Sequence, residues 1–324
     1  MSDENSHDRL VYSRSQVEEM ALRHRTWGRW GHDDDLGHVN YLDETRVREA
    51  SRLIRRGTTF SLAIPLDRKG PQNPRTWRIS PQHLMLRHGG DILAAEAALQ
   101  QGIQATDDAV YLPLQAGTQW DAFCHIFYNK QTYNGRGPET VTGLGATANS
   151  IAAMTNRLIG RGVLLDIARF FGCEYLEPGI VIQADDLRAC AAAQRVDIGE
   201  GDVVVIRTGH LARRRAEPSW GDYSGGPAPG LGLGTSDFLC PRHVAAVASD
   251  TWGLEVIPSE CPELAHPLHV VLLVNAGILI GEIWDVEALA ADCADDGVYE
   301  FFLAAQPMTI TGAVGSPINP IAIK

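Results

Sequence analysis

Segments of strand type alternate with segments of helix type in the second half of the chain, and this alternation restricts the fold more than any other feature. The strands expected in this half are 162–167, 203–207, 254–257 and 276–281. The helices expected there are 146–158, 185–194, 241–249 and 286–291. The first half holds more strand and loop, with helices expected at 15–25 and 43–56 and a strand at 59–66. This mixture predicts a mixed α/β fold rather than a purely doubly wound sheet.

Local signals mark several boundaries in the first half. Ser15 and Glu18 have the spacing of a capping box, which would start the first helix. Asp43 is a candidate N-cap for the second helix, and Gly57 is a candidate stop after it. The loop at 71–81 is rich in Pro, Asn and Arg, and loops of this length tend to be functional.

The sequence predicts one domain. Its 324 residues, of which 44% are hydrophobic, are enough to bury a large core. No repeat, low-complexity tract or linker is evident, so we assign 15–324 to one α/β domain, preceded by a disordered or mobile arm at 1–14. The Gly- and Pro-rich run at 221–234 is too flexible for a core and is predicted to form a lid or rim.

Composition excludes several classes of partner. The net charge of −12 would repel nucleic acid and anionic membrane surfaces. Apolar runs are too short to span a bilayer, and the polar, acidic N-terminus lacks the apolar region of a signal peptide, so we expect a cytoplasmic protein. The six cysteines show no paired spacing and are expected to be reduced core residues.

Three common nucleotide-binding or catalytic motifs are missing from the sequence. The glycine-rich runs at 199–201 and 230–234 do not have the register of a dinucleotide-binding loop, and no phosphate-binding P-loop occurs. We therefore expect no nucleotide cofactor. The GxSxG nucleophile elbow of many serine hydrolases is missing too.

The segment 114–125 concentrates polar side chains between apolar neighbours. If it is a strand, Gln115, Gln119 and Asp121 point to one side, and His125 can join them four residues later. Oxygen and nitrogen groups that converge in this way are typical of a metal site or an acid–base site. The alternative is structural: Asp121 would cap backbone amides and His125 would be a core histidine.

The same segment resembles the signature His-x-Gly-Thr-His-x-Asp-x-Pro-x-His of the cyclase family, which includes kynurenine formamidases and isatin hydrolases. Four signature residues match in register: Gly117, Thr118, Asp121 and His125. Three differ, with Gln115, Gln119 and Phe123 in place of His, His and Pro. Further similarity lies at 30–40, 201–209, 269–282 and 315–320. The resemblance implies the family's α/β fold, with a mixed or barrel-like β-sheet core surrounded by helices.

The resemblance also implies roles for individual residues. In the family, the residues that match Asp121, His269 and Glu282 bind metal, and the His that matches His125 is the general acid/base. The positions of Gln115 and Gln119 carry metal-binding His in the two-zinc formamidases, so one ligand set is retained here and the other lacks both imidazoles. Since one ligand set is retained, we expect one divalent ion: Mn²⁺, Zn²⁺ or Mg²⁺. An amide oxygen at the position of either glutamine suits hard cations better than zinc.

Other residues are candidates for substrate contact. Trp120 and Phe123 flank the signature and suggest a planar or apolar substrate. His210 follows an expected strand end, where active-site residues of α/β proteins gather. His266 is a candidate rim residue, and His88 could supply a missing imidazole.

The leading hypothesis is a metal-dependent hydrolase of a small cyclic or aryl amide, lactone or formamide. A metal-activated water would attack the carbonyl, His125 would move the proton, and Gln115 and Gln119 would hydrogen-bond the water or the oxyanion. The alternative is a metal-independent cyclase, dehydratase or isomerase that uses Asp121 and His125 as an acid/base pair. A third is a binding protein without catalysis. By analogy alone, we expect a homodimer or homotetramer whose partner is a small molecule.

Overall fold

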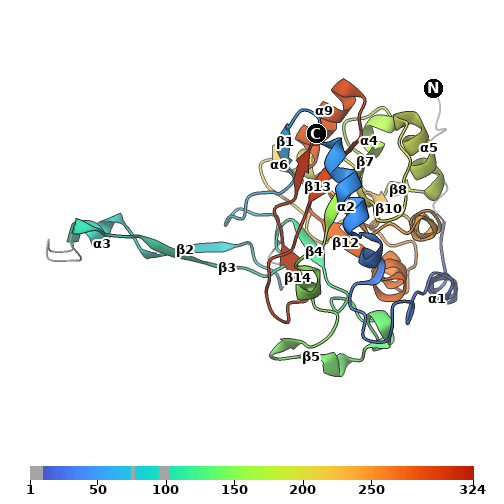
Figure 1. Cartoon of the computed structure of the whole chain (residues 1–324), viewed down its shortest axis with the longest axis horizontal. Coiled ribbons are helices and arrows are strands. Elements are labelled where there is room, and N and C mark those ends of the chain that lie inside the picture. The colour runs from blue at the N-terminus through green and yellow to red at the C-terminus, as the bar shows by residue number, and fades with distance from the viewer. Residues whose placement is uncertain (1–9, 74–76, 95–101) are drawn as a thin grey trace.

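A curled mixed sheet of nine strands forms the centre of the computed structural model, which describes residues 10–73, 77–94 and 102–324 (Figure 1). The strand order is β1-β15-β13-β7-β9-β11-β12-β4-β14. These strands are β1 Thr59–Ser61, β4 Gln119–Asp121, β7 Ile159–Asp166, β9 Val203–Arg207, β11 Ala246–Ser249, β12 Leu279–Glu282, β13 Glu300–Ala304, β14 Gly315–Pro317 and β15 Ile321–Ile323. The α/β class and the barrel-like core expected from the sequence are confirmed.

Four neighbouring strands, β7, β9, β11 and β12, run parallel in the middle of the sheet. Every residue of β9 is buried, which is why Val203–Arg207 is a nearly continuous apolar run rather than an alternating one. The strands on either side are antiparallel to their neighbours. One of these antiparallel groups, β12-β4-β14, includes the segment singled out in the sequence.

Helices cover the sheet. The α-helices are α1 Arg14–Arg23, α2 Glu44–Ala50, α3 Gly89–Ala94, α4 Ile167–Phe170, α5 Ala184–Gln194, α6 His210–Ala216, α7 Ser236–Leu239, α8 Pro267–His269 and α9 Glu287–Asp296. A π-helix, η9 Val270–Ala276, continues directly from α8. Helices α2 and α5 pack on β7, and α1 packs on η9.

Short 3₁₀ helices and two-stranded pairs complete the described elements. The 3₁₀ helices are η1 Gly37–Tyr41, η2 Ser51–Leu53, η4 Tyr133–Gly135, η5 Pro138–Thr140, η6 Ile151–Met154, η7 Leu233–Thr235 and η8 Cys240–Arg242. The pairs are β2 Gln82–Arg87 with β3 Asp107–Tyr111, β5 Val141–Thr142 with β6 Gly145–Ala146, and β8 Val181–Ile182 with β10 Gly230–Leu231.

The start of the first helix differs from the sequence-based expectation. The capping box is formed by Ser13 and Gln16, not by Ser15 and Glu18. Glu18 instead accepts hydrogen bonds from Arg14 and from the hydroxyl of Tyr128. Both serines have a side chain of capping-box type three residues later, and the structure uses the earlier pair.

The second helix begins as predicted, with the Asp43 carboxylate accepting from the N–H of Arg46. It changes to 3₁₀ geometry at Ser51 and ends before Gly57.

Strand β9 has the predicted bounds, and β7, β12, α5 and α9 lie close to theirs. Three predictions were wrong. The expected strand at 254–257 makes only isolated bridges. The expected helix at 146–158 contains no α-helix, only the last residue of β6 and the 3₁₀ helix η6. The expected helix at 241–249 contains strand β11. In the last case His243 has a left-handed backbone (φ 54°) that ends the helical turn, and Ala246–Ser249 then pairs with β9 and β12.

The run at 221–234 does not form the exposed lid that its glycines suggested. Tyr223, Leu231 and Leu233 are almost fully buried, and β10 within the run pairs with β8. Gly230 permits this packing, because a Cβ there would lie 2.5 Å from the backbone carbonyl carbon of Glu255. The glycines therefore serve close approach of backbones rather than flexibility.

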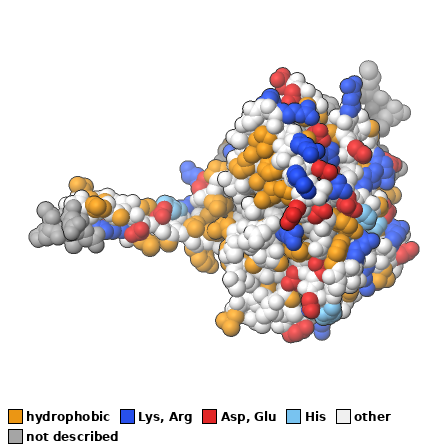
Figure 2. Space-filling model, in the orientation of Figure 1, with side chains coloured by type: hydrophobic (Ala, Val, Ile, Leu, Met, Phe, Trp, Pro, Cys, Tyr) orange, Lys and Arg blue, Asp and Glu red, His pale blue; other side chains and the backbone are white. Residues whose placement is uncertain are grey.

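A hairpin of β2 and β3 projects from the body as an arm, with α3 at its outer end (Figure 1). Hydrophobic side chains are exposed along it, as Figure 2 shows. They include Leu84, Met85, Leu86, Val110 and Tyr111. His88 lies beside α3 on this arm, so it does not supply an imidazole to the segment 114–125.

One close approach fixes the end of the π-helix. The N–H of His38 donates to the carbonyl of Gly277 at 2.7 Å, and a Cβ at Gly37 would lie 2.3 Å from that same carbonyl oxygen. Gly37 and Gly277 both have positive φ, which glycine adopts without strain. Because Gly277 lies two residues before β12, this contact helps to place the strand that carries Glu282.

All six cysteines are free, and Cys173 is the exposed one. Burial raises the pKa of Cys124 and of Cys190 to about 12, so these thiols stay protonated and unreactive. No helix within the described part of the chain has the length and apolarity needed to cross a bilayer.

Candidate functional site

Strand register brings two carboxylates to one face of the sheet. Gln119 of β4 pairs with Glu282 of β12, and Asp121 lies two residues after Gln119 on the same face. The side chains of Gln119, Asp121 and Glu282 are buried. Trp120 points to the opposite face, where it packs on Trp284 and donates from its indole N–H to a core carbonyl at 2.6 Å. The structure therefore does not bring Trp120 to the candidate site.

The amide of Gln119 links the two carboxylates. Its Nε2 donates to Asp121 Oδ1 at 3.2 Å and to Glu282 Oε2 at 2.8 Å. Ionised carboxylates only accept, so the orientation of this amide is fixed and both of its hydrogens are used. Its Oε1 is buried without a hydrogen-bond partner among the described residues.

His269 completes a three-residue group with Asp121 and Glu282. It lies in α8, and its Nε2 is 3.5 Å from Glu282 Oε1 and 3.9 Å from Asp121 Oδ2. Burial disfavours the charged imidazole, but the hydrogen bonds to Glu255 and Glu282 outweigh that effect and raise the pKa of His269 to about 10. Burial, together with the charge of Asp121, raises the pKa of Glu282 above its usual range.

This group fits a divalent cation. One ligand atom from each of Asp121, His269 and Glu282 lies within 4.8 Å of the others, and all three residues are buried. Two carboxylate oxygens and one imidazole nitrogen are a donor set that Mn²⁺, Zn²⁺ and Mg²⁺ all accept. A bound cation would balance the negative charge of the two buried carboxylates. Without it, a proton on His269 Nε2 balances part of that charge.

His125 stands on the accessible side of this group. Its Nε2 is 3.9 Å from Asp121 Oδ1, and its side chain is 17% exposed, whereas those of Asp121, His269 and Glu282 are at most 5% exposed. Burial lowers the pKa of His125, against the opposite effect of Asp121. A neutral imidazole beside solvent and a buried centre can accept a proton at Nε2.

Arg78 is a site residue that was not predicted individually. Its Nη2 lies 3.4 Å from His125 Nε2, and its guanidinium lies 5.1 Å from the centre of the Trp252 ring. The available signal was the loop at 71–81, whose length and composition suggested a function. Arg78 places a permanent positive charge at the edge of a centre that is otherwise acidic.

Gln115 reaches the site from a turn, not from the strand that was expected, because β4 begins only at Gln119. Its amide packs over Gly315, where a Cβ would lie 2.4 Å from Gln115 Nε2. Gly315 pairs with Asp121 across β14 and β4, so Gln115 lies on the face that carries Asp121. Its Nε2 is buried with no hydrogen-bond partner among the described residues.

Of the remaining candidates, Phe123 and His210 lie in the core, and His266 lies beside the site. Phe123 packs in the core against Tyr133, at 4.9 Å between ring centres. His210 is fully buried and stacks on Tyr223 at 5.4 Å, with neither ring nitrogen bonded within the described part of the chain. His266 lies beside His269, at 5.1 Å between ring centres, and its side chain is 31% exposed.

Glu255 is a second residue that sequence reasoning missed. It is buried, and its Oε1 lies 2.6 Å from His269 Nδ1. The only signal was one acidic residue in the apolar run at 254–257, which was assigned to a strand.

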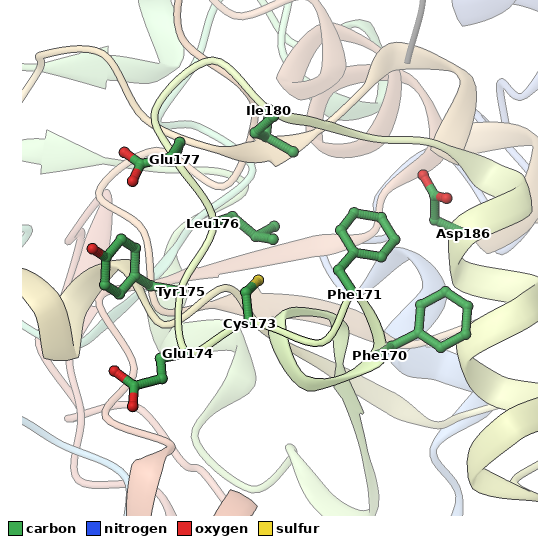
Figure 3. Close-up of a pocket in the computed structure, with 9 residues that line it drawn as sticks. All are labelled: Phe170, Phe171, Cys173, Glu174, Tyr175, Leu176, Glu177, Ile180 and Asp186. Carbon is green, nitrogen blue, oxygen red and sulfur yellow. The ribbon is translucent and has the colours of Figure 1, made fainter. Parts of the chain in front are cut away.

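A separate surface hollow of about 800 Å³ lies beside α4 and α5 (Figure 3). Its lining is Phe170, Phe171, Cys173, Glu174, Tyr175, Leu176, Glu177, Ile180 and Asp186. It contains none of the candidate site residues named above. Its size alone therefore does not make it the catalytic centre.

These observations define a mixed α/β protein with a buried carboxylate–imidazole group at one side of its sheet. The model of the cyclase family ("Putative cyclase") matches residues 51–256. The chain therefore belongs to the cyclase family, as the signature segment indicated.

Solved structures agree with this assignment. A crystal structure described as a novel cyclase is 43% identical, covers 94% of this chain and 99% of its own, and superposes with a TM-score of 0.85. Isatin hydrolase A from Labrenzia aggregata, bound to benzyl benzoate, is 20% identical, with coverage of 84% and 94% and a TM-score of 0.58. A potential metal-dependent hydrolase with cyclase activity is 18% identical, with coverage of 82% and 96% and a TM-score of 0.50. No curated protein matches the chain. At such low identity, the last two structures establish the fold alone.

The burial of His210 predicts a pH-dependent stability. Burial, followed by the nearby Arg214 and Arg213, lowers its pKa from 6.5 to about 4. Between these values the unfolded chain binds the proton and the folded chain does not, so the free energy of unfolding falls as the pH decreases. We expect His210→Phe, which can keep the stacking on Tyr223, to remove up to roughly 3 kcal/mol of this loss, at about 1.4 kcal/mol per pKa unit.

The measurement is chemical denaturation of both proteins at pH 7 and at pH 4.5. Leu144→Phe is the control, because Leu144 is fully exposed and carries no ionisable group. An identical loss of stability in the parent and in His210→Phe would contradict this account of His210.

Proposed function

We propose that the chain is a metal-dependent hydrolase of a small cyclic or aryl amide, lactone or formamide. The observation that carries this proposal is the convergence of buried Asp121, His269 and Glu282 within 4.8 Å, beside the accessible His125. Family membership supports an enzyme of hydrolase or cyclase type. Structures described as isatin hydrolases and as a potential metal-dependent hydrolase share its fold.

In this proposal Asp121, His269 and Glu282 hold one divalent ion: Mn²⁺, Zn²⁺ or Mg²⁺. When bound, such an ion acidifies a water molecule and polarises a carbonyl group. His125 accepts the proton at Nε2 and returns it to the leaving nitrogen or oxygen. Arg78 stands beside the same Nε2, where its charge suits the carboxylate that hydrolysis of an amide or lactone produces.

The two glutamines have different roles in this scheme. Gln119 Nε2 already donates to Asp121 and Glu282, so it cannot also stabilise an oxyanion. Its Oε1, which has no hydrogen-bond partner in the part of the chain that the structure describes, is able to accept a hydrogen bond from a water molecule or a substrate N–H. Gln115 Nε2, buried and unpartnered within the described residues, is the better oxyanion donor.

A metal-independent acid/base enzyme is the second candidate. Gln119 already bridges the two carboxylates, and a protonated His269 compensates their charge, so the group is not bare without an ion. Asp121 and His125 would then act as the acid/base pair of a cyclisation, dehydration or isomerisation. Elemental analysis of the purified protein separates the two: about one bound metal ion per chain supports the hydrolase, and metal-free active protein supports the alternative.

We expect His125→Ala to lower the rate strongly and to leave the metal content unchanged. General acid/base catalysis contributes roughly a hundred- to ten-thousand-fold to a rate, whereas His125 is outside the proposed ligand group. Turnover of a panel of aryl amides and lactones, and metal content by elemental analysis, provide the two readouts. His83→Ala on the arm is the control, since His83 contacts Asp108 there. Loss of the metal from His125→Ala would make His125 a ligand instead.

We expect Gln115→His combined with Gln119→His to increase zinc affinity and stoichiometry. Both glutamines lie on the face of Asp121, and imidazole suits Zn²⁺ far better than an amide oxygen does. Zinc titration of metal-stripped parent and double variant at one pH gives the comparison. Gln306→His, at an exposed position, controls for adventitious binding by a new surface histidine. Equal affinity and stoichiometry in a folded double variant would indicate that these positions do not face a metal pocket.

We also propose that a second copy of the chain covers the arm. An isolated two-stranded hairpin is at best marginally stable, and both faces of this one carry exposed apolar residues. Leu84 and Tyr111 lie on one face, since Gln82 pairs with Tyr111. The arm is also continuous with the loop that brings Arg78 to the site.

We expect the parent to be at least dimeric in sedimentation equilibrium and Leu84→Gln with Tyr111→Gln to shift it toward the monomer. Leu144→Gln is the matched control, because Leu144 is fully exposed but lies in the β5–β6 turn, away from the arm. A monomeric parent, or a double variant with unchanged mass, would be inconsistent with arm-mediated assembly.

A further inference from the structure

His269 lies between two acidic groups, one at each ring nitrogen. Asp121 and Glu282 face Nε2, as described above. On the other side, Glu255 Oε1 lies 2.6 Å from Nδ1. Glu255, His266 and His269 also form a second set of three residues whose ligand atoms are close enough for a cation. Glu255 could thus be either a ligand of a second ion or a group that acts on His269.

Hydrogen-bond donors decide between these two roles. The carboxylate of Glu255 accepts from the N–H of Leu268 at 3.0 Å and from the N–H of His269 at 3.1 Å. Since an ionised carboxylate has no hydrogen to donate, the contact at 2.6 Å requires a hydrogen on His269 Nδ1. A protonated ring nitrogen cannot bind a metal. His266 Nδ1, at 3.8 Å from Glu255, is beyond hydrogen-bond distance.

We propose that Glu255 is a positioning residue that directs Nε2 of His269 to the cation site. With the hydrogen held at Nδ1, the lone pair of a neutral His269 must be at Nε2, which faces Asp121 and Glu282. A carboxylate on the far nitrogen also makes an imidazole a stronger ligand and fixes the ring plane. This inference rests on the proposed cation centre and adds a residue to it.

The surroundings of Glu255 suit this role. Its side chain is 3% exposed, so water does not compete for the contact with Nδ1. The same carboxylate binds the ring of His269 and the backbone N–H of His269 and of Leu268, so ring and main chain are held by one anchor. The backbone of Glu255 is tied in turn by a bridge to Leu231.

A merely structural carboxylate would behave differently. Asp250 is the matched comparison: it is buried, and it accepts from the N–H groups of Thr208 and Gly209 at 2.8 and 2.7 Å. It therefore holds a turn of backbone, as Glu255 does. The structure shows no histidine hydrogen-bonded to Asp250 in the described part of the chain. Replacing it should cost stability without changing how tightly a metal binds to the folded protein.

The test is a zinc titration of metal-stripped parent, Glu255→Gln and Asp250→Asn at one pH, with folding verified for each. We expect Glu255→Gln to bind zinc roughly 10- to 100-fold more weakly at unchanged stoichiometry, and Asp250→Asn to bind it like the parent. Parent-like affinity in Glu255→Gln would overturn the positioning role while leaving the cation centre intact. A parent that binds no zinc, manganese or magnesium would instead overturn the proposed centre, and this inference with it.

A second measurement needs no variant. In the zinc-loaded parent, nitrogen-15 NMR of the histidine rings should show the hydrogen of His269 at Nδ1 and the metal at Nε2. The reverse arrangement would show that Glu255 does not set the tautomer, even if Glu255→Gln fails to fold.

Discussion

Two buried carboxylates on neighbouring antiparallel strands are the constraint on which the rest of the centre depends. Asp121 and Glu282 repel each other, and burial removes the water that would screen them. Each neighbouring polar group reduces this cost: Gln119 donates to both carboxylates, and His269 presents Nε2 to both. A divalent cation would compensate the same charges more completely. The arrangement is thus stable enough to fold and still suited to bind a positive ligand.

The position of His269 depends on contacts far from the centre in sequence. The short helix α8 passes directly into a π-helix, which ends where Gly277 meets Gly37. Glu255 holds the start of this unit, and the Gly37–Gly277 contact holds its end. Since β12 begins two residues after Gly277, the same unit places both His269 and Glu282. Irregular helical geometry at this point therefore serves to set two residues of the centre at once.

Prediction from the sequence worked best where one local pattern dominates. The apolar run of β9 and the N-cap Asp43 were found because strand burial and capping are nearly local properties. It failed at 241–249, where alanines favour a helix but pairing with β9 and β12 makes a strand. It also failed at 221–234, where glycines permit tight packing instead of flexibility. In each failure the deciding partner is distant in the sequence, so no local pattern contains it.

The sequence by itself determined the family, the α/β class and the segment around Asp121 and His125, because signature residues and strand runs are readable without a partner. Strand alternation also placed Gln119 and Asp121 on one face, but only the tertiary structure decided which other side chains join them. Pairing of β4 with β12 directs Gln119 and Asp121 toward Glu282 and sends Trp120 into the core. Folding of distant segments adds Arg78 and Glu255, which no motif marked. The physical reason is that hydrogen-bond donors and charges act over a few ångströms in space, and that distance is set by sheet register and packing rather than by position in the chain.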